Sequence, residues 1–177
     1  MSHYTIHGAP GSPYSLKVRA ALRAKRIIHV WNILSAESRG EIFGHVRAPV
    51  IPVIQTPNGS WTNDSTPFLL GLDEAGEGRA IVPTEPAARF ACLLIEDMAD
   101  EWVTKAMFHY RWAYSQDAEQ LSRWLIFDNM PNAGTDAIEA PAAAIARRQI
   151  DRMPIVGCTP DTAHIIEASA KRLMGIL

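Results

Sequence analysis

The sequence predicts an α/β region with the element order βαβαββα and a mixed four-stranded sheet, followed by an all-α region. Short apolar, β-branched runs alternate with helical patterns over residues 1–78, which is typical of βαβ units. The turn signal Thr56-Pro57-Asn58-Gly59 indicates an antiparallel hairpin. Residues 87–130 contain neither Gly nor Pro, which favours helix. We therefore expect one domain over 1–78, a linker over 79–85 and a helical domain over 86–177.

A βαβ unit opens the chain. Residues 3–8 alternate in polarity and end at a Pro/Gly cluster, as a short strand does. Ser12 can cap a helix whose first position is Pro13. Residues 27–34 are rich in β-branched and aromatic side chains and predict a second strand, parallel to the first after a right-handed crossover.

Three cations crowd the end of the first predicted helix: Arg23, Lys25 and Arg26. Cations near a helix C-terminus interact favourably with its dipole. We expect all three side chains to be solvated.

The second part of the α/β region is predicted as a helix, a hairpin and a helix. A helical stretch over about 36–46 precedes strands at 50–54 and 60–62. The last helix follows Asp64-Ser65 and ends in the Gly-rich segment after Gly71. This order of elements is that of a thioredoxin-like domain.

The helical region opens at Glu85-Pro86, because proline favours the first helical position. Further helices are expected over 117–128, over the alanine-rich patch 140–146, and from Thr159-Pro160 to Leu177. Two apolar stripes at i,i+4 spacing cover the first long helix, so it must pack on more than one neighbour. They consist of Phe90, Leu94, Met98, Trp102 and Ala106, and of Ile95, Ala99, Val103, Met107, Tyr110 and Tyr114.

Composition narrows the function classes. The formal net charge is -2, which gives no basic footprint for nucleic acid or an anionic membrane. No leader-like segment or membrane-length apolar run is evident, so the expected location is cytoplasmic. Cys92 and Cys158 lack metal-binding spacing, and we expect two reduced thiols, no disulfide and no metal site.

The segment Ser12-Pro13-Tyr14-Ser15 lies where a redox thioredoxin-like protein carries Cys-x-x-Cys. Hydroxyls replace both sulfurs, so this segment cannot itself exchange thiols for disulfides. A redox carrier is therefore disfavoured. Ser12 can instead donate a hydrogen bond to a thiolate that a ligand brings; the alternative is that it only caps the helix.

Two further segments can hold a peptide-like ligand. A cis Ile51-Pro52 bond would leave the Ile51 backbone free to pair with an extended ligand, although most X-Pro bonds are trans. Asp64-Ser65 begin a helix, where backbone N–H groups and a hydroxyl suit a carboxylate. Alternatively, Pro52 merely starts an edge strand and Asp64-Ser65 merely cap a helix.

In this order and spacing, residues 7–27 and 50–74 resemble the glutathione-binding domain of serine-type glutathione transferases, and residues 83–125 resemble the opening helices of their C-terminal domain. The resemblance implies that Ser12 is the catalytic hydroxyl and that glutathione is a co-substrate. The glutathione-binding residues that it implies are Ser12, Tyr14, Ile51, Pro52, Asp64 and Ser65.

The resemblance also implies a small electrophilic substrate and a homodimer. Candidates for contact with the electrophile are Met107, Tyr110, Arg111 and Tyr114, for which ordinary packing is the alternative. The C-terminal domain is expected to be shorter than in the family. A shorter domain would leave Phe90 and Leu94 partly uncovered and makes a non-catalytic binding or assembly protein of the same fold the rival function.

Overall fold

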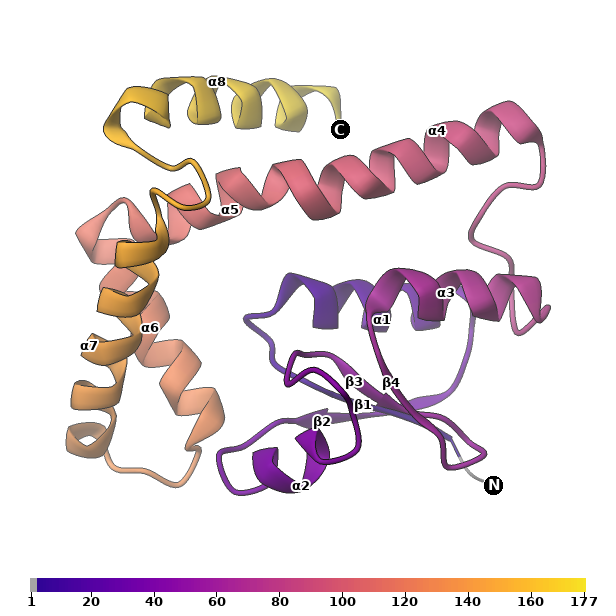
Figure 1. The fold of residues 1–177 in the computed structure, drawn as a ribbon, viewed down its shortest axis with the longest axis horizontal. Coiled ribbons are helices and arrows are strands. Elements are labelled where there is room, and N and C mark those ends of the chain that lie inside the picture. The colour runs from indigo at the N-terminus through magenta and orange to yellow at the C-terminus, as the bar shows by residue number, and fades with distance from the viewer. Residues whose placement is uncertain (1–2) are drawn as a thin grey trace. The chain divides into compact units, whose positions relative to one another are not determined.

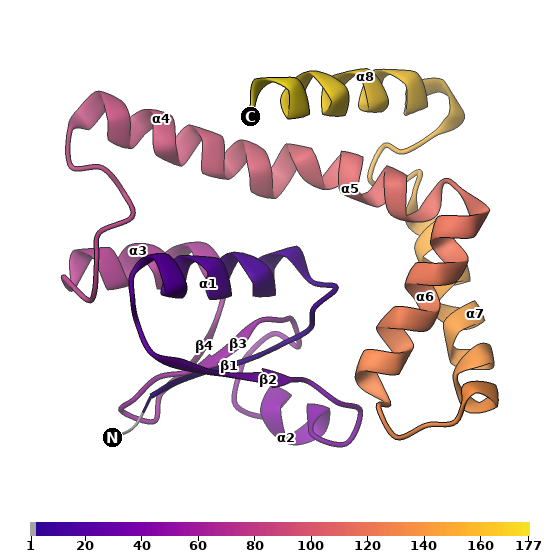
Figure 2. The ribbon, with the colours of Figure 1, turned by 180° about the vertical axis from the view of Figure 1, so that it is seen from behind.

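The structure is a computed structural model that describes residues 3–177, and it contains two compact units (Figures 1 and 2). The first unit runs to Thr84 and includes Asp128–Pro131. The second comprises Glu85–Phe127 and Asn132–Leu177. Whether these units correspond to domains 1–78 and 86–177 stays a prediction.

The first unit has the predicted βαβαββα order. Its strands form one mixed sheet in the order β2-β1-β3-β4, with β1 and β2 parallel and the other pairs antiparallel. The thioredoxin-like fold is thereby confirmed. The elements are β1 (Tyr4–Gly8), α1 (Pro13–Ala24), β2 (His29–Ile33), α2 (Arg39–Phe43), β3 (Val53–Gln55), β4 (Trp61–Asn63) and α3 (Ser65–Glu74).

Helices α1 and α3 lie on one face of the sheet, and α2 lies on the other (Figure 1). Each face has an apolar cluster, because successive side chains of a strand point to opposite faces. On the α1/α3 face the buried residues are Tyr4, Ile6, Val18, Leu22, Ile54, Leu69 and Leu72. On the α2 face they are Leu34, Ile42 and Val53.

The hairpin between β3 and β4 forms at the predicted turn. The Thr56 N–H donates to Ser60 O over 2.9 Å, and the Gly59 N–H donates to Thr56 O over 2.9 Å. Gly59 has φ +88°, a left-handed conformation that glycine adopts without steric cost. The predicted hairpin turn is therefore confirmed, with glycine at the position that needs a positive φ.

The prediction that Lys25 is solvated was wrong. Lys25 is 1% exposed, and its ammonium group donates to Asp73 Oδ1 in α3 and to the Arg79 carbonyl over 3.2 Å. A buried charge requires such partners because it has lost its hydration. The helix-dipole argument failed because Asp73, the partner, lies 48 residues further along the chain.

The second unit is all-α, as predicted. Its helical elements are α4 (Pro86–Asp97), the π-helix η1 (Met98–Trp102), α5 (Val103–Trp112), α6 (Ser115–Asn129), α7 (Thr135–Arg152) and α8 (Pro160–Ile176). Glu85 caps α4 by accepting from the N–H groups of Ala87 and Ala88, and α8 begins at Pro160 as expected.

The continuous α-helical stripes predicted for 90–114 were wrong, because η1 interrupts them. A π-helix makes i→i+5 hydrogen bonds, so it shifts the face on which later residues lie. On α4 no residue is buried, and Phe90 and Leu94 are 69% and 55% exposed.

Within residues 3–177, none of the helices is long and apolar enough to cross a membrane.

Candidate functional site

The sheet register brings the predicted glutathione-binding segments to one end of the sheet. His7 in β1 lies opposite Val53 in β3, and Val53 lies opposite Asn63 in β4. These three residues are close to the points where the chain leaves β1, enters β3 and leaves β4. Three segments therefore lie next to the same end of the sheet. They are the α1 N-terminus, the Ile51-Pro52 bond and the α3 N-terminus.

Ser12 is the N-cap of α1. Its Oγ accepts a hydrogen bond from the Ser15 N–H over 3.2 Å, and Pro13 is the first helical residue. The bond uses a lone pair of the hydroxyl oxygen and leaves its hydrogen available to a ligand. Capping and donation are therefore compatible, although the sequence presented them as alternatives.

Ser15 is a packing residue. It is fully buried, and its Oγ accepts from the Ala9 N–H over 3.4 Å. A Cβ atom at Gly8 would lie 2.5 Å from Ser15 Oγ, so only glycine lets the end of β1 pass this close to α1. Sequence reasoning missed Gly8, which directly precedes the Pro/Gly cluster and was counted as an ordinary strand end.

The Ile51-Pro52 peptide bond is cis. Ile51 is half-buried and packs against the apolar cluster on the α2 face, while Pro52 is buried. The neighbouring Val50 carbonyl accepts from Asn63 Nδ2 over 3.4 Å, and the Ala48 carbonyl accepts from the same group over 2.7 Å. Asn63, at the end of β4, thus holds the loop that leads into the cis bond.

The α3 N-terminus has an unusual backbone. Asp64 has φ +90°, which is sterically costly for a residue with a side chain, and its carboxylate makes no capping hydrogen bond. Asp64 is exposed, and Ser65, the first helical residue, is 5% exposed. The ordinary capping role considered for Asp64 is therefore not observed.

A hydrogen bond joins α1 to the first turn of α3. Lys17 Nζ in α1 donates to Thr66 Oγ1 in the first turn of α3 over 2.9 Å. Because β1 and β4 leave the sheet at the same end, α1 and α3 both begin there, and their positive dipole ends favour an anionic ligand. Tyr14 lies half-buried in the first turn of α1.

An aromatic stack lies on the α2 face of the sheet. The His7 and Trp61 rings are 5.5 Å apart, and the Trp61 and His45 rings are stacked at 4.2 Å. Burial lowers the pKa of His7. The charge of Glu41 opposes this decrease, and the charge of His45 adds to it. His7 Nε2 is buried without a hydrogen-bond partner among the described residues. No sequence pattern signals this stack, because its members come from three distant segments.

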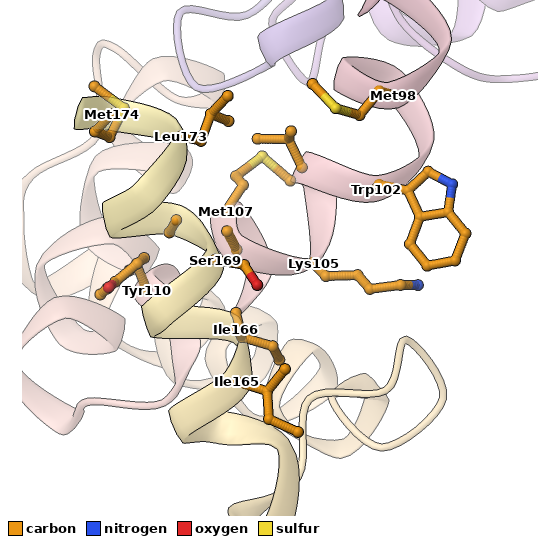
Figure 3. A pocket seen from close by; sticks show the side chains of 13 residues that line it. Met98, Trp102, Lys105, Met107, Tyr110, Ile165, Ile166, Ser169, Leu173 and Met174 are labelled. Carbon is orange, nitrogen blue, oxygen red and sulfur yellow. The ribbon is translucent and has the colours of Figure 1, made fainter. Parts of the chain in front are cut away.

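The four predicted electrophile-contacting residues all lie on or just after α5 but do not share one site. Met107 and Tyr110 line an apolar pocket between α5 and α8, whereas Arg111 and Tyr114 are absent from its lining (Figure 3). Arg111 is half-buried, and burial lowers its pKa. The Tyr114 hydroxyl donates to Glu167 Oε1 over 2.5 Å, which raises the pKa of Tyr114. Contact with an electrophile stays a prediction for all four.

Within the described residues, there is no group of three or more His, Cys, Asp or Glu side chains that could hold a metal ion. Cys92 and Cys158 are both free thiols.

Residues 11–75 match the family model described as the glutathione S-transferase N-terminal domain. No curated protein sequence matches the chain.

Solved structures with similar folds include three glutathione transferases. A glutathione S-transferase from Methylobacillus flagellatus KT with glutathione bound has a TM-score of 0.52 at 18% identity, over 85% of this chain and 66% of that one. The Tau class glutathione S-transferase from mango (Mangifera indica) has a TM-score of 0.52 at 16% identity, over 97% of this chain and 98% of that one. Glutathione transferase Omega 3C from Trametes versicolor has a TM-score of 0.56 at 12% identity, over 90% of each chain.

This chain spans just under two thirds of the Methylobacillus protein. At these identities the likeness shows a shared fold, and the family model carries the assignment of the N-terminal region. Residues 11–75 are therefore similar to the N-terminal domain of the glutathione S-transferases.

Proposed function

We propose that the chain is a glutathione transferase in which Ser12 stabilises the thiolate of bound glutathione for attack on a small hydrophobic electrophile. The observation that carries this proposal is the geometry of Ser12. Its oxygen accepts from the Ser15 N–H at the tip of α1, and its own hydrogen is available to a sulfur atom.

The proposed binding mode assigns one part of glutathione to each segment. The Ile51 backbone pairs with the cysteinyl unit as an added strand would, because a peptide-like ligand satisfies unpaired N–H and C=O groups. Ser65 and the first N–H groups of α3 hold the γ-glutamyl carboxylate, and Asp64 pairs with its ammonium group. Tyr14 lies beside the sulfur, and Pro52 fixes the path of the chain into β3.

The energies are sufficient for thiolate formation. A cysteinyl thiol has a pKa of about 8.5, so only a few per cent is ionised at neutral pH. A hydrogen bond to a charged group contributes roughly 1.5–3 kcal/mol, and a helix N-terminus roughly 0.3–1 kcal/mol. At about 1.4 kcal/mol per unit, the two together lower the pKa of the thiol by about one to three units.

The chemical step is an addition or substitution at carbon. The thiol proton passes to solvent, the sulfur lone pair forms the C–S bond, and any leaving group departs with its bonding pair. Ser12 donates a hydrogen bond throughout and does not take up the proton. Alignment of thiolate and electrophile supplies much of the remaining acceleration.

Replacement of Ser12 by alanine tests the proposal. With 1-chloro-2,4-dinitrobenzene and glutathione, we expect kcat/KM to fall by about 10- to 150-fold, equivalent to a lost charged hydrogen bond of roughly 1.5–3 kcal/mol. The pH profile should also shift to higher pH. Ser60→Ala, in the exposed hairpin turn, is the matched control. A Ser12→Ala protein with the full rate would refute the role of Ser12.

The rival proposal is a binding or assembly protein of the same fold. The exposed Phe90 and Leu94 side chains favour it, because large exposed apolar side chains in a row mark interaction surfaces. Retention on immobilised glutathione without turnover of any electrophile would support the rival. Retention with turnover supports the transferase.

A further inference from the structure

The loop over residues 45–50, which connects α2 to β3, is held on the sheet by side chains of β4. Trp61 and Asn63 are two residues apart in β4, so their side chains point to the same face of the sheet. Trp61 packs against the apolar cluster on the α2 face, and its ring stacks on that of His45 at 4.2 Å with 5° between the planes. Asn63 binds the other end of the loop.

The side-chain amide of Asn63 matches its two acceptors, because an asparagine amide carries two N–H hydrogens. Nδ2 lies 2.7 Å from the Ala48 carbonyl oxygen and 3.4 Å from the Val50 carbonyl oxygen. The Val50 N–H donates to the same Ala48 carbonyl over 2.8 Å, so residues 48–50 form a closed turn. Asn63 therefore holds both ends of this turn.

The bond to Val50 also fixes the direction of the next N–H group. The Val50 carbonyl and the Ile51 N–H belong to one trans peptide unit. Such a unit is planar, and its C=O and N–H groups point in opposite directions. Because the carbonyl is directed at Asn63, the Ile51 N–H is directed away from it, and none of the residues 3–177 accepts a hydrogen bond from it. The donor is therefore oriented before a ligand arrives.

The turn depends on Asn63 for its conformation. Residues 48–50 are all exposed, and among the described residues no other side chain forms a hydrogen bond with them. A segment with few buried contacts opens locally at little cost in free energy. Removal of the Asn63 amide should therefore release the turn and leave the Ile51 N–H without a fixed direction.

We propose that Asn63 is a positioning residue for glutathione, which orients the Ile51 N–H towards the cysteinyl carbonyl of the tripeptide. This inference rests on the proposed function, in which the cysteinyl unit pairs with the Ile51 backbone. Asn63 acts through Ile51 and does not itself contact the ligand. Its contribution is therefore confined to ligands that carry a cysteinyl carbonyl, because a donor that is oriented in advance loses less entropy on binding.

Two ligands that differ in this carbonyl test the proposal. S-methylglutathione carries the carbonyl and has no thiol with which to react. γ-Glutamyl-S-methylcysteamine has the same γ-glutamyl and thioether groups but lacks the cysteinyl carbonyl and the glycine. Calorimetric titration of the full-length chain gives the Kd of the first ligand, and competition against that ligand gives the Kd of the second.

Asn63→Leu keeps the branched shape of the side chain and removes both donors. We expect the Kd of S-methylglutathione to rise about three- to tenfold, the equivalent of one lost hydrogen bond, and that of the cysteamine derivative to change less than about twofold. Asn32→Leu makes the same exchange at an exposed position of β2 and should alter neither affinity. Thermal unfolding confirms that each variant is folded.

Ser65→Ala is the contrasting variant. It removes a proposed contact to the γ-glutamyl end, which both ligands share, so it should weaken both. Turnover of 1-chloro-2,4-dinitrobenzene gives a second readout for Asn63→Leu. The KM for glutathione should rise by about the factor seen in binding, and kcat at saturating glutathione should change less than about twofold, because Asn63 does not contact the sulfur.

Two results would overturn the role of Asn63. The first is an unchanged affinity of Asn63→Leu for S-methylglutathione, and the second is equal weakening of both ligands, which would indicate a general distortion of the hairpin. If the parent chain and Asn63→Leu bind as expected but the parent turns over no electrophile, the transferase proposal fails and the role of Asn63 stands. A parent chain that binds neither ligand refutes both, so the two failures are distinguishable.

Discussion

His7 is a buried imidazole on the inner strand β1. It is 8% exposed, and burial lowers its pKa below the ordinary value of 6.5. The unfolded chain therefore binds a proton more readily than the folded chain. The free energy of unfolding should fall as pH drops below about 6.5 and stop falling below the folded pKa of His7.

His7→Phe tests this dependence. Phenylalanine keeps a ring against Trp61 and removes the unpartnered Nε2 atom. We expect higher stability at neutral pH and a shallower loss between pH 7.5 and 5, measured by urea unfolding at several pH values. His3→Phe, at an exposed position, should leave the slope unchanged. An identical slope for His7→Phe and the parent protein would contradict the assignment.

The positive φ of Asp64 predicts a difference between two substitutions. Asp64→Gly and Asp64→Ala both remove the carboxylate, but only glycine adopts φ +90° without steric cost. Asp64→Ala should therefore be less stable than Asp64→Gly by about 1 kcal/mol, measured by thermal unfolding. Both should bind immobilised glutathione more weakly than the parent chain, and equal stability of the two would count against backbone strain here.

The end of α3 is tied to two other segments by one carboxylate. Asp73 accepts from Lys25, the C-cap residue of α1, from the Val82 N–H over 2.7 Å and from the Ile81 N–H over 3.2 Å. Burial alone would raise the pKa of Asp73, but these donors outweigh it and the pKa is lowered below 3.8. The contribution of Asp73 to stability is present above about pH 5 and is lost as pH falls through its folded pKa.

Asp73→Asn should therefore destabilise the first unit. The substitution leaves the Lys25 ammonium buried without a counter-charge, which costs about 3–5 kcal/mol. Glu74→Gln, at the exposed neighbouring position, is the control and should change stability little. Chemical denaturation at neutral pH measures both. A loss in the free energy of unfolding below about 1 kcal/mol for Asp73→Asn would contradict this prediction. It would mean that the Lys25 ammonium group becomes hydrated when its partner is removed.

At the level of elements, the features that could be predicted from the sequence are those that local chemistry determines. The cap at Ser12, the turn at Asn58-Gly59 and the start at Pro160 depend on a few neighbouring residues, and all were predicted correctly. The Lys25–Asp73 pair and the π-helix depend on packing between distant segments. Neither a charge count nor an i,i+4 pattern carries that information.

At the level of the whole molecule, the order of segments predicts a shared site, which stays a prediction. The register, which was not predictable from the sequence, places the strand ends next to Ser12, Ile51 and Ser65 at one end of the sheet. Gly8 and the pocket between α5 and α8 escaped prediction. Each is defined by the space between two elements rather than by a sequence pattern.

The homodimer that the resemblance implies can be tested on the exposed face of α4. Phe90→Glu places a charge on that face, and we expect sedimentation velocity to show a shift from two chains to one, because desolvating a new charge in an interface is costly. Ala91→Glu, on another part of the α4 surface, should leave the mass unchanged. A single-chain mass for the parent protein would end the dimer proposal.

The contact between Gly8 and Ser15 makes the two hydroxyls of the Ser-x-x-Ser segment unequal targets for engineering. A sulfur atom is larger than the oxygen it would replace, and Ser15 is fully buried, with its Oγ packed so close to Gly8 that even a Cβ atom there would lie 2.5 Å from it. A cysteine at Ser15 would therefore have to move the helix tip. Ser12, partly open to solvent, accepts cysteine without such a shift. Converting this scaffold to redox chemistry would therefore yield a one-cysteine enzyme that forms mixed disulfides more readily than an internal one.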